Sequence, residues 1–259
     1  MRFLWIFLFS MFAASLFAGE IEINGSYQGD NLYVQNPYAE SGVGFCVFEV
    51  MVNGQTTTDE INSNSFEIDL SVFRFAIGEP VQVIIKYKEG CEPAVINPDV
   101  LAPRASFKTI DIAVNQDNLI WKTNHEAGSL PFIVEQYRWN KWVQVGSVNG
   151  KGVPGTHEYR IPVRMHSGEN RFRVRQTDHN NKRQLSPEVV LEKNKPAVSI
   201  ASMKVEDSLV FSEPTLYEIY DIQGRIVFKG YDDSVSVQGL ERGDYYLNFD
   251  NQMSIFTKQ

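Results

Sequence analysis

The sequence predicts an all-β protein of three small antiparallel β-sandwich domains in tandem after a signal peptide. Of the 259 residues, 43% are hydrophobic and 12% are aromatic, and β-branched residues are common. Apolar and polar residues alternate with period two over short runs, and helix-like periodicity is nearly absent. Turn signals recur about every 8–12 residues, which is typical of sandwiches.

Residues 1–18 are predicted to be a secretory signal peptide. Arg2 precedes an apolar run, Phe3–Phe17, and small residues lead to Gly19. The run is shorter than the roughly 20 residues that span a bilayer as a helix. No cysteine lies near the cut, and no later segment is apolar enough to cross a membrane. We therefore expect export across an inner membrane, without an integral membrane span.

The first predicted domain is residues 19–103, a β-sandwich with one disulfide. Its expected strands are Ile21–Ile23, Leu32–Gln35, Phe45–Val52, Phe66–Val72 and Val81–Tyr87. Asn53-Gly54 predicts a two-residue hairpin turn. Alternate residues form three apolar rows: Cys46, Phe48, Val50 and Val52; Phe66, Ile68, Leu70 and Val72; Val81, Val83, Ile85 and Tyr87.

Cys46 and Cys91 are the two cysteines of the sequence. In an exported chain, a single pair predicts a disulfide. Cys46 lies on an apolar row, so it is expected to point into the core and pin the later segment at Cys91. No histidine lies near either cysteine in sequence, which argues against a metal site.

The second predicted domain is residues 104–195. Its expected strands and closing segments are Leu119–Thr123, Phe132–Gln136, Trp142–Gly146, Asn170–Asp178 and Leu185–Val190. In this order they resemble a fibronectin type III-like module of exported Bacteroidota proteins. The resemblance implies a Trp-bearing strand, a strand pair behind it, and a final hairpin that turns at residues 179–181.

The third predicted domain is residues 196–259. A strand ending at Asp221, a turn at Gln223-Gly224 and a strand over Arg225–Lys229 come first, and Gly230–Asp233 is expected to break the chain. The sequence from Gly243 onward predicts two more strands, which complete a small antiparallel sandwich.

Two runs of this third domain, Asp221–Val227 and Leu240–Tyr245, resemble the C-terminal sorting domain of Bacteroidota proteins exported by the type IX secretion system. The turn glycine, the arginine after it and the Gly-x-Tyr opening fall in the same order. The residues of this sorting-like motif are Asp221, Gly224, Arg225, Gly243 and Tyr245. The resemblance implies a cell-envelope route and a protein partner in the outer-membrane secretion machinery.

Charge differs between the three blocks. Residues 19–103 hold 3 basic and 13 acidic residues (net −10), residues 104–195 hold 15 and 9 (+6), and residues 196–259 hold 5 and 10 (−5). The candidate docking patch in the basic block is Arg160, Arg164, Arg171, Arg173 and Arg175. It would suit an acidic protein or an acidic surface glycan, because arginine binds such groups bidentately. The alternative is a solvated sheet face opposite acidic neighbours. The acidic flanking blocks argue against nucleic acid.

No local motif predicts catalysis, a cofactor or a metal. The four histidines are dispersed and form no H-E-x-x-H, and no G-x-S-x-G occurs. The stretch Gly146–Gly152 is glycine-rich but lacks P-loop spacing, so a hairpin loop explains it better. The sequence therefore predicts a protein that is not an enzyme.

The leading functional expectation is a structural or docking protein that works with the type IX apparatus, for example bound to its translocon. Sorting domains of the family usually follow a Tyr-Pro-Asn-Pro-like stretch and end in spaced lysines. Residues 197–213 lack the first feature, and Lys258-Gln259 replaces the second. The expected location is the periplasm or the outer membrane. The alternative is a small exported cargo at the cell surface that binds glycan or protein.

Overall fold

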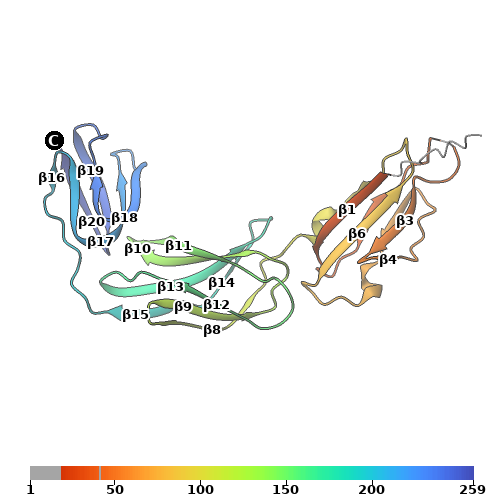
Figure 1. Ribbon diagram of the computed structural model, residues 1–259, viewed down its shortest axis with the longest axis horizontal. Coiled ribbons are helices and arrows are strands. Elements are labelled where there is room, and N and C mark those ends of the chain that lie inside the picture. Colours follow the sequence, from red (N-terminus) through yellow and green to blue (C-terminus); the bar gives the residue numbers. More distant parts are fainter. Residues whose placement is uncertain (1–18, 41) are drawn as a thin grey trace, which may run out of the picture. The chain divides into compact units, whose positions relative to one another are not determined.

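The computed structural model describes residues 19–40 and 42–259, so the predicted signal peptide lies outside the described part (Figure 1). The chain divides into two compact units, which meet in sequence between Ala102 and Pro103 and are called unit 1 and unit 2. Within the described ranges, no helix is long and apolar enough to cross a membrane. The all-β class is confirmed, since the described residues form strands and two short 3-10 helices joined by turns and loops.

Unit 1 contains two antiparallel sheets around one hydrophobic core. Its elements are β1 (Gly19–Ser26), β2 (Leu32–Gln35), β3 (Val47–Val52), β4 (Gln55–Thr56), β5 (Ser65–Ile68), η1 (Leu70–Phe73), β6 (Pro80–Tyr87), β7 (Ala94–Val95) and η2 (Pro98–Leu101). One sheet has the order β1-β6-β3-β4 and the other has the order β5-β2-β7. Asn53 and Gly54 have positive φ between β3 and β4, which confirms the predicted hairpin turn.

Two of the predicted apolar rows in unit 1 are interrupted. The predicted strand Phe66–Val72 is wrong beyond Ile68, because η1 follows and leaves Val72 exposed. Phe48 is also exposed, although Cys46, Val50 and Val52 are buried. The pairing of β3 with β6 shifts register between Val47 and Glu49, and this bulge turns Phe48 away from the core.

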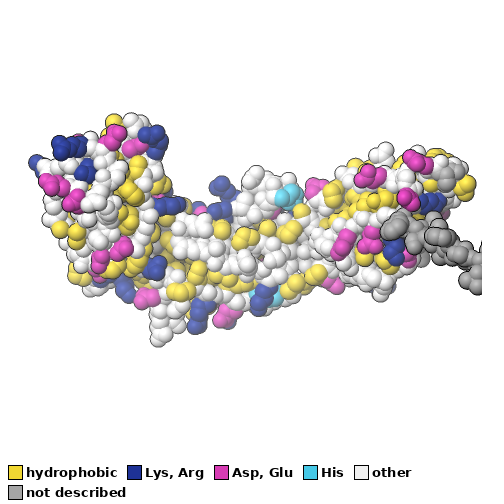
Figure 2. Space-filling model, turned by 45° about the horizontal axis from the view of Figure 1, so that its top comes forward, with side chains coloured by type: hydrophobic (Ala, Val, Ile, Leu, Met, Phe, Trp, Pro, Cys, Tyr) yellow, Lys and Arg dark blue, Asp and Glu magenta, His cyan; other side chains and the backbone are white. Residues whose placement is uncertain are grey.

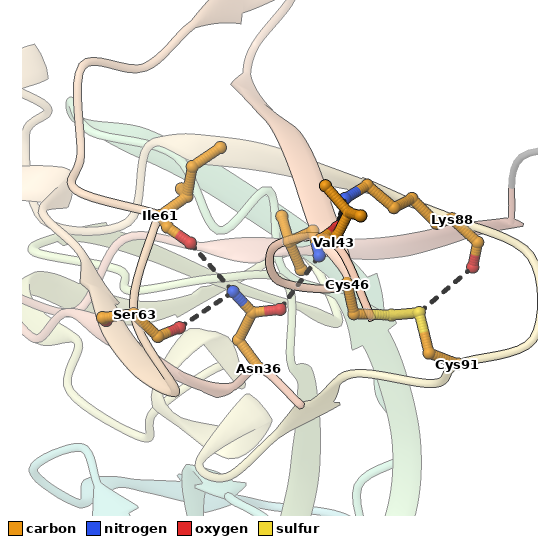
Figure 3. Close-up of a disulfide and its surroundings, with 8 residues drawn as sticks. Asn36, Val43, Cys46, Ile61, Ser63, Lys88 and Cys91 are labelled. Carbon is orange, nitrogen blue, oxygen red and sulfur yellow. Dashed lines mark hydrogen bonds between the residues drawn. A yellow bond between two sulfur atoms is a disulfide. The ribbon is translucent and has the colours of Figure 1, made fainter. Parts of the chain in front are cut away.

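The predicted disulfide is confirmed, since Cys46 is bonded to Cys91 (Figure 3). Asn36 lies beside this bond and is fully buried. Its side-chain amide donates to the carbonyls of Ile61 and Ser63, at 2.9 and 3.0 Å, and its oxygen accepts from the Val47 amide at 2.9 Å. The covalent bond and this buried polar contact hold the loop before β3 against its neighbours.

The first part of unit 2 is an eight-stranded antiparallel sandwich, called here the middle sandwich. Its strands are β8 (Lys108–Asn115), β9 (Asn118–Asn124), β10 (Pro131–Arg138), β11 (Lys141–Asn149), β12 (His157–Pro162), β13 (Gly168–Thr177), β14 (Arg183–Leu185) and β15 (Val189–Lys193). One sheet has the order β12-β9-β8, and the other has the order β11-β10-β13-β14 with β15 also paired to β13. Trp121, Phe132 and Tyr159 pack together at its centre, with Trp121 stacked on Tyr159 and edge-on to Phe132.

The second part of unit 2 is called here the C-terminal module. Its strands are β16 (Lys204–Val205), β17 (Ser208–Tyr220), β18 (Ile226–Ser236), β19 (Gly243–Phe249) and β20 (Gln252–Lys258). They form one hydrogen-bonded sheet of order β16-β20-β19-β17-β18, in which β16 runs parallel to β20. Residues from both halves of β17, such as Leu209 and Ile219, enter the same core cluster.

Gly230–Asp233 does not break the chain, contrary to the sequence-based expectation. These residues continue β18, and the irregularity lies in its pairing with β17, which shifts register between Val210 and Thr215. Gly230 gives the Tyr217 ring room inside the strand, because a Cβ there would lie 2.8 Å from the Tyr217 hydroxyl. The second and third predicted domains thus form unit 2, each with a hydrophobic cluster of its own, and the three-domain division stays a prediction.

Candidate docking surfaces of unit 2

The sorting-like motif begins with a tight turn that Asp221 closes. Its carboxylate accepts hydrogen bonds from the amides of Gln223 and Arg225, both at 2.9 Å, and from the Arg225 Nε at 2.6 Å. Gly224 has φ +79°, a left-handed conformation that favours glycine. The bonds from Arg225 hold the pKa of the Asp221 carboxyl below its ordinary value. The Arg225 side chain itself remains 75% exposed, so it is oriented and accessible.

The two runs of the motif meet at one cleft. The cleft has a volume of about 460 Å³, and its lining includes Asp221, Arg225, Gly243 and Tyr245 of the motif. Tyr245 is held in place by stacking on Phe256. This "motif cleft" brings together residues that are about twenty positions apart in sequence, and it carries side chains of both charges.

The opposite end of β19 is joined to the middle sandwich by a contact that sequence reasoning missed. Arg138 is only 3% exposed. Its guanidinium donates to the side chain of Gln136 at 2.7 Å, to the carbonyl of Asp250 at 2.9 Å and to that of Arg164 at 3.1 Å. Burial lowers the pKa of Arg138 to about 10, although the Asp250 carboxylate acts in the opposite direction. We call this contact region the junction.

The Asp250 carboxylate is the acceptor at the centre of the junction. It accepts from the backbone amide and hydroxyl of Ser167, at 3.1 and 2.5 Å, and from the Val198 amide at 3.2 Å. Burial acts to raise the pKa of Asp250, but these donors outweigh it and hold the pKa below its ordinary value. A buried carboxylate that binds both parts of unit 2 fixes one against the other.

The turn between β10 and β11 forms the rest of the junction. Trp139 and Asn140 both have positive φ, as a two-residue hairpin requires, although a bulky residue rarely adopts it. The Trp139 ring is buried, and its Nε1 donates to the Phe249 carbonyl at 3.4 Å. Lys141 then donates to Glu218 and to the Tyr220 hydroxyl, both at 2.5 Å. Two-residue hairpin turns usually hold Asn-Gly, and this one holds Trp139-Asn140. This unusual turn sequence could have indicated from the sequence that Trp139 makes a tertiary contact.

Three arginines of the candidate docking patch lie on β13 and are paired within the middle sandwich. Arg173 and Arg175 share Glu135, at 2.8 and 2.9 Å, and Arg171 binds Glu188 at 2.5 Å. The Arg173 guanidinium also lies 4.0 Å from the centroid of the Trp142 ring. These contacts already occupy the guanidinium groups, which favours the alternative of a solvated sheet face.

The structure does not bring the other two arginines into this row. Arg160 belongs to β12, in the opposite sheet of the sandwich. Arg164 lies at the junction, where its guanidinium is 4.2 Å from the centroid of the Tyr231 ring. Figure 2 shows Lys and Arg side chains interspersed with Asp and Glu along the middle sandwich. A role of the five arginines as one patch stays a prediction that this arrangement does not favour.

Glu126 is a further buried polar group of unit 2, and the contacts of its carboxylate lie within the middle sandwich. The Glu126 carboxylate is 1% exposed and accepts from the hydroxyl of Tyr159 at 2.8 Å and from the amide of Gly152 at 2.8 Å. Gly152 packs so closely that a Cβ would lie 2.1 Å from the Ser129 amide. The glycine-rich stretch is therefore part of this packing. In residues 19–40 and 42–259, no three His, Cys, Asp or Glu side chains gather in a way that would hold a metal ion.

No protein-family model matches this sequence, and no curated protein matches it. Among solved structures, the fibronectin(III)-like modules of Clostridium thermocellum CbhA are 12% identical, with 59% of this chain and 94% of that chain covered and a TM-score of 0.22. A tetra-tandem repeat in the extending region of a large adhesion protein is 11% identical. The match covers 93% of this chain and 73% of that chain, with a TM-score of 0.31. The FN1–FN3 domains of chicken CNTN1 are 11% identical. The match covers 91% of this chain and 90% of that chain, with a TM-score of 0.23. At these values, the matches add nothing to the topology described above.

Proposed function

We propose that this chain is a non-enzymatic docking protein of the Bacteroidota cell envelope that works with the type IX secretion apparatus. The motif cleft would contact a protein partner in the outer-membrane secretion machinery. The location would be the periplasm or the outer membrane, after export across the inner membrane. The Cys46–Cys91 disulfide supports export, because such bonds persist in oxidising compartments.

One observation carries the choice of a retained component over cargo. The motif cleft is exposed at one end of the C-terminal module, while the other end is held by the buried contacts of Arg138 and Asp250. An address that is read and then removed would be expected on a separable domain. Here, removal of residues 196–259 would expose the buried Trp139 ring and leave Arg138 without the Asp250 carbonyl.

Intact-mass analysis of the protein from fractionated cells tests the proposal. A component retains its full C-terminus through Gln259 and stays with the periplasmic or outer-membrane fraction. A surface protein whose mass shows loss of the C-terminal module would contradict the proposal and establish the cargo alternative.

A passenger fusion gives an independent test. A fluorescent protein carrying residues 104–259 after a signal peptide, which keeps the junction intact, is expected to remain in the periplasm. Its appearance at the cell surface, dependent on the type IX system, would falsify the component role. A fusion to residues 19–102 is the matched control, because unit 1 is a separate compact all-β unit and lacks the sorting-like motif.

The partner contact is tested at Arg225 and Arg242, which both line the motif cleft. Exchange of both for Glu should abolish co-purification of the secretion-machinery partner, because two attractive charges become repulsive. The exchange also removes the ion pair between Arg225 and Asp221, and the loss of stability should be small because the Arg225 side chain is 75% exposed. Lys204→Glu on β16 is the control and should retain the partner.

A further inference from the structure

The junction contains a small pocket whose lining has an excess of positive charge. It has a volume of about 130 Å³, and Arg138 and Arg164 both line it. Among the residues that the structure describes, no Asp or Glu belongs to this lining, whereas three acidic residues line the motif cleft. We call it the junction pocket. Its volume is below the roughly 300 Å³ of drug-sized ligand sites and well above the roughly 10–15 Å³ that one water needs, so it suits a small polar group.

Arg138 is a buried cation that pairs with no carboxylate of the described residues. Its guanidinium has five N–H groups, and its three hydrogen bonds go to neutral oxygens of Gln136, Asp250 and Arg164, which leaves two N–H groups without such a bond. The Asp250 carboxylate already accepts from three other donors. Burial lowers the pKa of Arg138 to about 10, and Asp250 and Tyr231 offset only part of this effect. A buried charge is costly unless an opposite charge pairs with it, so this group favours an anion.

Arg164 supplies a second positive charge to the junction pocket. It is exposed, and its guanidinium lies 4.2 Å from the centroid of the Tyr231 ring. This contact with an aromatic ring orients the guanidinium and leaves its N–H groups for an acceptor. No acidic side chain in residues 19–40 or 42–259 forms an ion pair with Arg164. Gln144 and Tyr231 belong to the same lining, and their amide and hydroxyl groups can also donate hydrogen bonds.

We propose that the junction pocket binds one oxyanion group, a carboxylate, phosphate or sulfate, through Arg138 and Arg164. Such groups accept hydrogen bonds from guanidinium in a fork geometry. The bound anion compensates the buried charge of Arg138. Both arginines belong to the middle sandwich, while Leu216 and Tyr231 of the same lining belong to the C-terminal module. Occupancy of the pocket therefore also strengthens the junction, because the anion binds only where both parts meet.

The test uses the chain from Gly19 to Gln259 and three probes, which are sodium phosphate, sodium sulfate and sodium acetate. Sodium chloride keeps the ionic strength constant, so general screening does not change during a titration. Nitrogen–proton NMR spectra follow the Nε–H group of Arg138 and the backbone amides of Gln144 and Val145. We expect saturable shifts with a Kd of about 1 mM for at least one probe. Tightest binding of acetate assigns the pocket to a carboxylate, and tightest binding of phosphate or sulfate assigns it to a tetrahedral group.

Two exposed residues of the lining allow variants that should fold normally. Arg164→Gln removes one of the two positive charges and should weaken binding about tenfold. Gln144→Glu adds a carboxylate of nearly the same size to the lining and should abolish binding, because it repels the probe. Arg160→Gln is the matched control, because Arg160 is exposed on β12 and does not line the pocket. Its Kd should stay within about twofold of wild type.

Thermal unfolding gives a second readout, because the tryptophans of the described residues all lie in unit 2 and report its melting. Phosphate and sulfate stabilise proteins in general, so the measured quantity is the rise in melting temperature of wild type beyond that of Gln144→Glu. A bound anion should give such an excess rise, because it stabilises only the folded state.

Four results would overturn the inference. They are the absence of a saturable shift with all three probes, an unchanged Kd in Arg164→Gln, an unchanged Kd in Gln144→Glu, and the same shifts when sodium chloride alone is raised. The first would mean that the junction pocket holds only water. The inference goes beyond the proposed docking role and does not depend on it, because capture of the secretion-machinery partner is tested at the motif cleft.

Discussion

At the scale of single residues, unit 2 depends on groups whose roles come from burial. Arg138 and Trp139 are adjacent in sequence, and both contact the turn after β19, through Asp250 and Phe249. Trp139 holds a left-handed backbone conformation that costs about 1–2 kcal/mol for an L-residue. Burial of its ring against the C-terminal module offsets this cost. The two side chains explain why the middle sandwich and the C-terminal module form one unit.

Arg138→Met is expected to lower the free energy of unfolding of unit 2 by about 2–4 kcal/mol. Methionine keeps much of the buried side-chain volume, but the acceptors on Gln136, Arg164 and Asp250 lose their donor. Denaturant unfolding monitored by tryptophan fluorescence measures the change. Arg242→Met is the control, because Arg242 is exposed, and it should stay within about 0.5 kcal/mol of wild type. Equal effects of the two substitutions would contradict the role given to Arg138.

His166 should make the stability of unit 2 depend on pH. It is 1% exposed, its Nδ1 lies 2.7 Å from the Ser167 carbonyl, and its Nε2 has no hydrogen-bond partner. Burial lowers the pKa of His166 below its ordinary 6.5, and Arg138 acts in the same direction while Asp250 opposes both. The unfolded chain therefore binds a proton more readily than the folded one. The contribution of the neutral His166 ring to the stability of unit 2 is fully present above pH 6.5. It is lost as the pH falls toward the lowered pKa of the folded state.

The melting temperature of unit 2 should consequently fall as the pH is lowered below 6.5, and His166→Gln should flatten this part of the profile. His125→Gln is the matched control, because His125 is exposed and should leave the slope unchanged. A slope that persists in His166→Gln would assign the pH dependence to another group.

At the scale of elements, the turn between β17 and β18 has the clearest sequence requirement. Gly224 and Gly239 both have open space where a Cβ would be added, but only Gly224 has a φ in the left-handed region. Gly224→Ala should therefore cost about 1 kcal/mol, while Gly239→Ala should be nearly neutral. Thermal unfolding of the two variants separates backbone strain from side-chain crowding. A comparable loss in both would mean that the conformation of the turn is not the cause.

At the scale of the whole molecule, the two units should unfold in separate transitions. The Cys46–Cys91 disulfide lies in unit 1 and closes a loop of about 46 residues, which the chain-entropy model values at about 4 kcal/mol. Exchange of both cysteines for Ala should lower the free energy of unfolding of unit 1 by this amount. One calorimetric transition should then move to lower temperature, and the other should stay in place. Arg138→Met should move only the second transition. A single transition that responds to both changes would contradict the division at Ala102.

The sequence by itself determined the all-β class, most strands, the disulfide and the order of the sorting-like motif. These features are local, because strand periodicity, turn residues and a lone cysteine pair are readable without knowing what packs against them. The errors of the sequence analysis had a cause that is not local, because the bulge that exposes Phe48 and the continuity of β18 both depend on the pairing strand.

Only the tertiary structure decided which residues make up the candidate docking surfaces. Arg138 reaches the Asp250 carbonyl across 112 positions of sequence, and the motif cleft joins two separate runs. The five candidate arginines lie on two different sheets and at the junction, because the packing of the sheets sets their positions. Which side chains meet is set by the packing of whole sheets, and period-two alternation carries no information about the partner across such a contact.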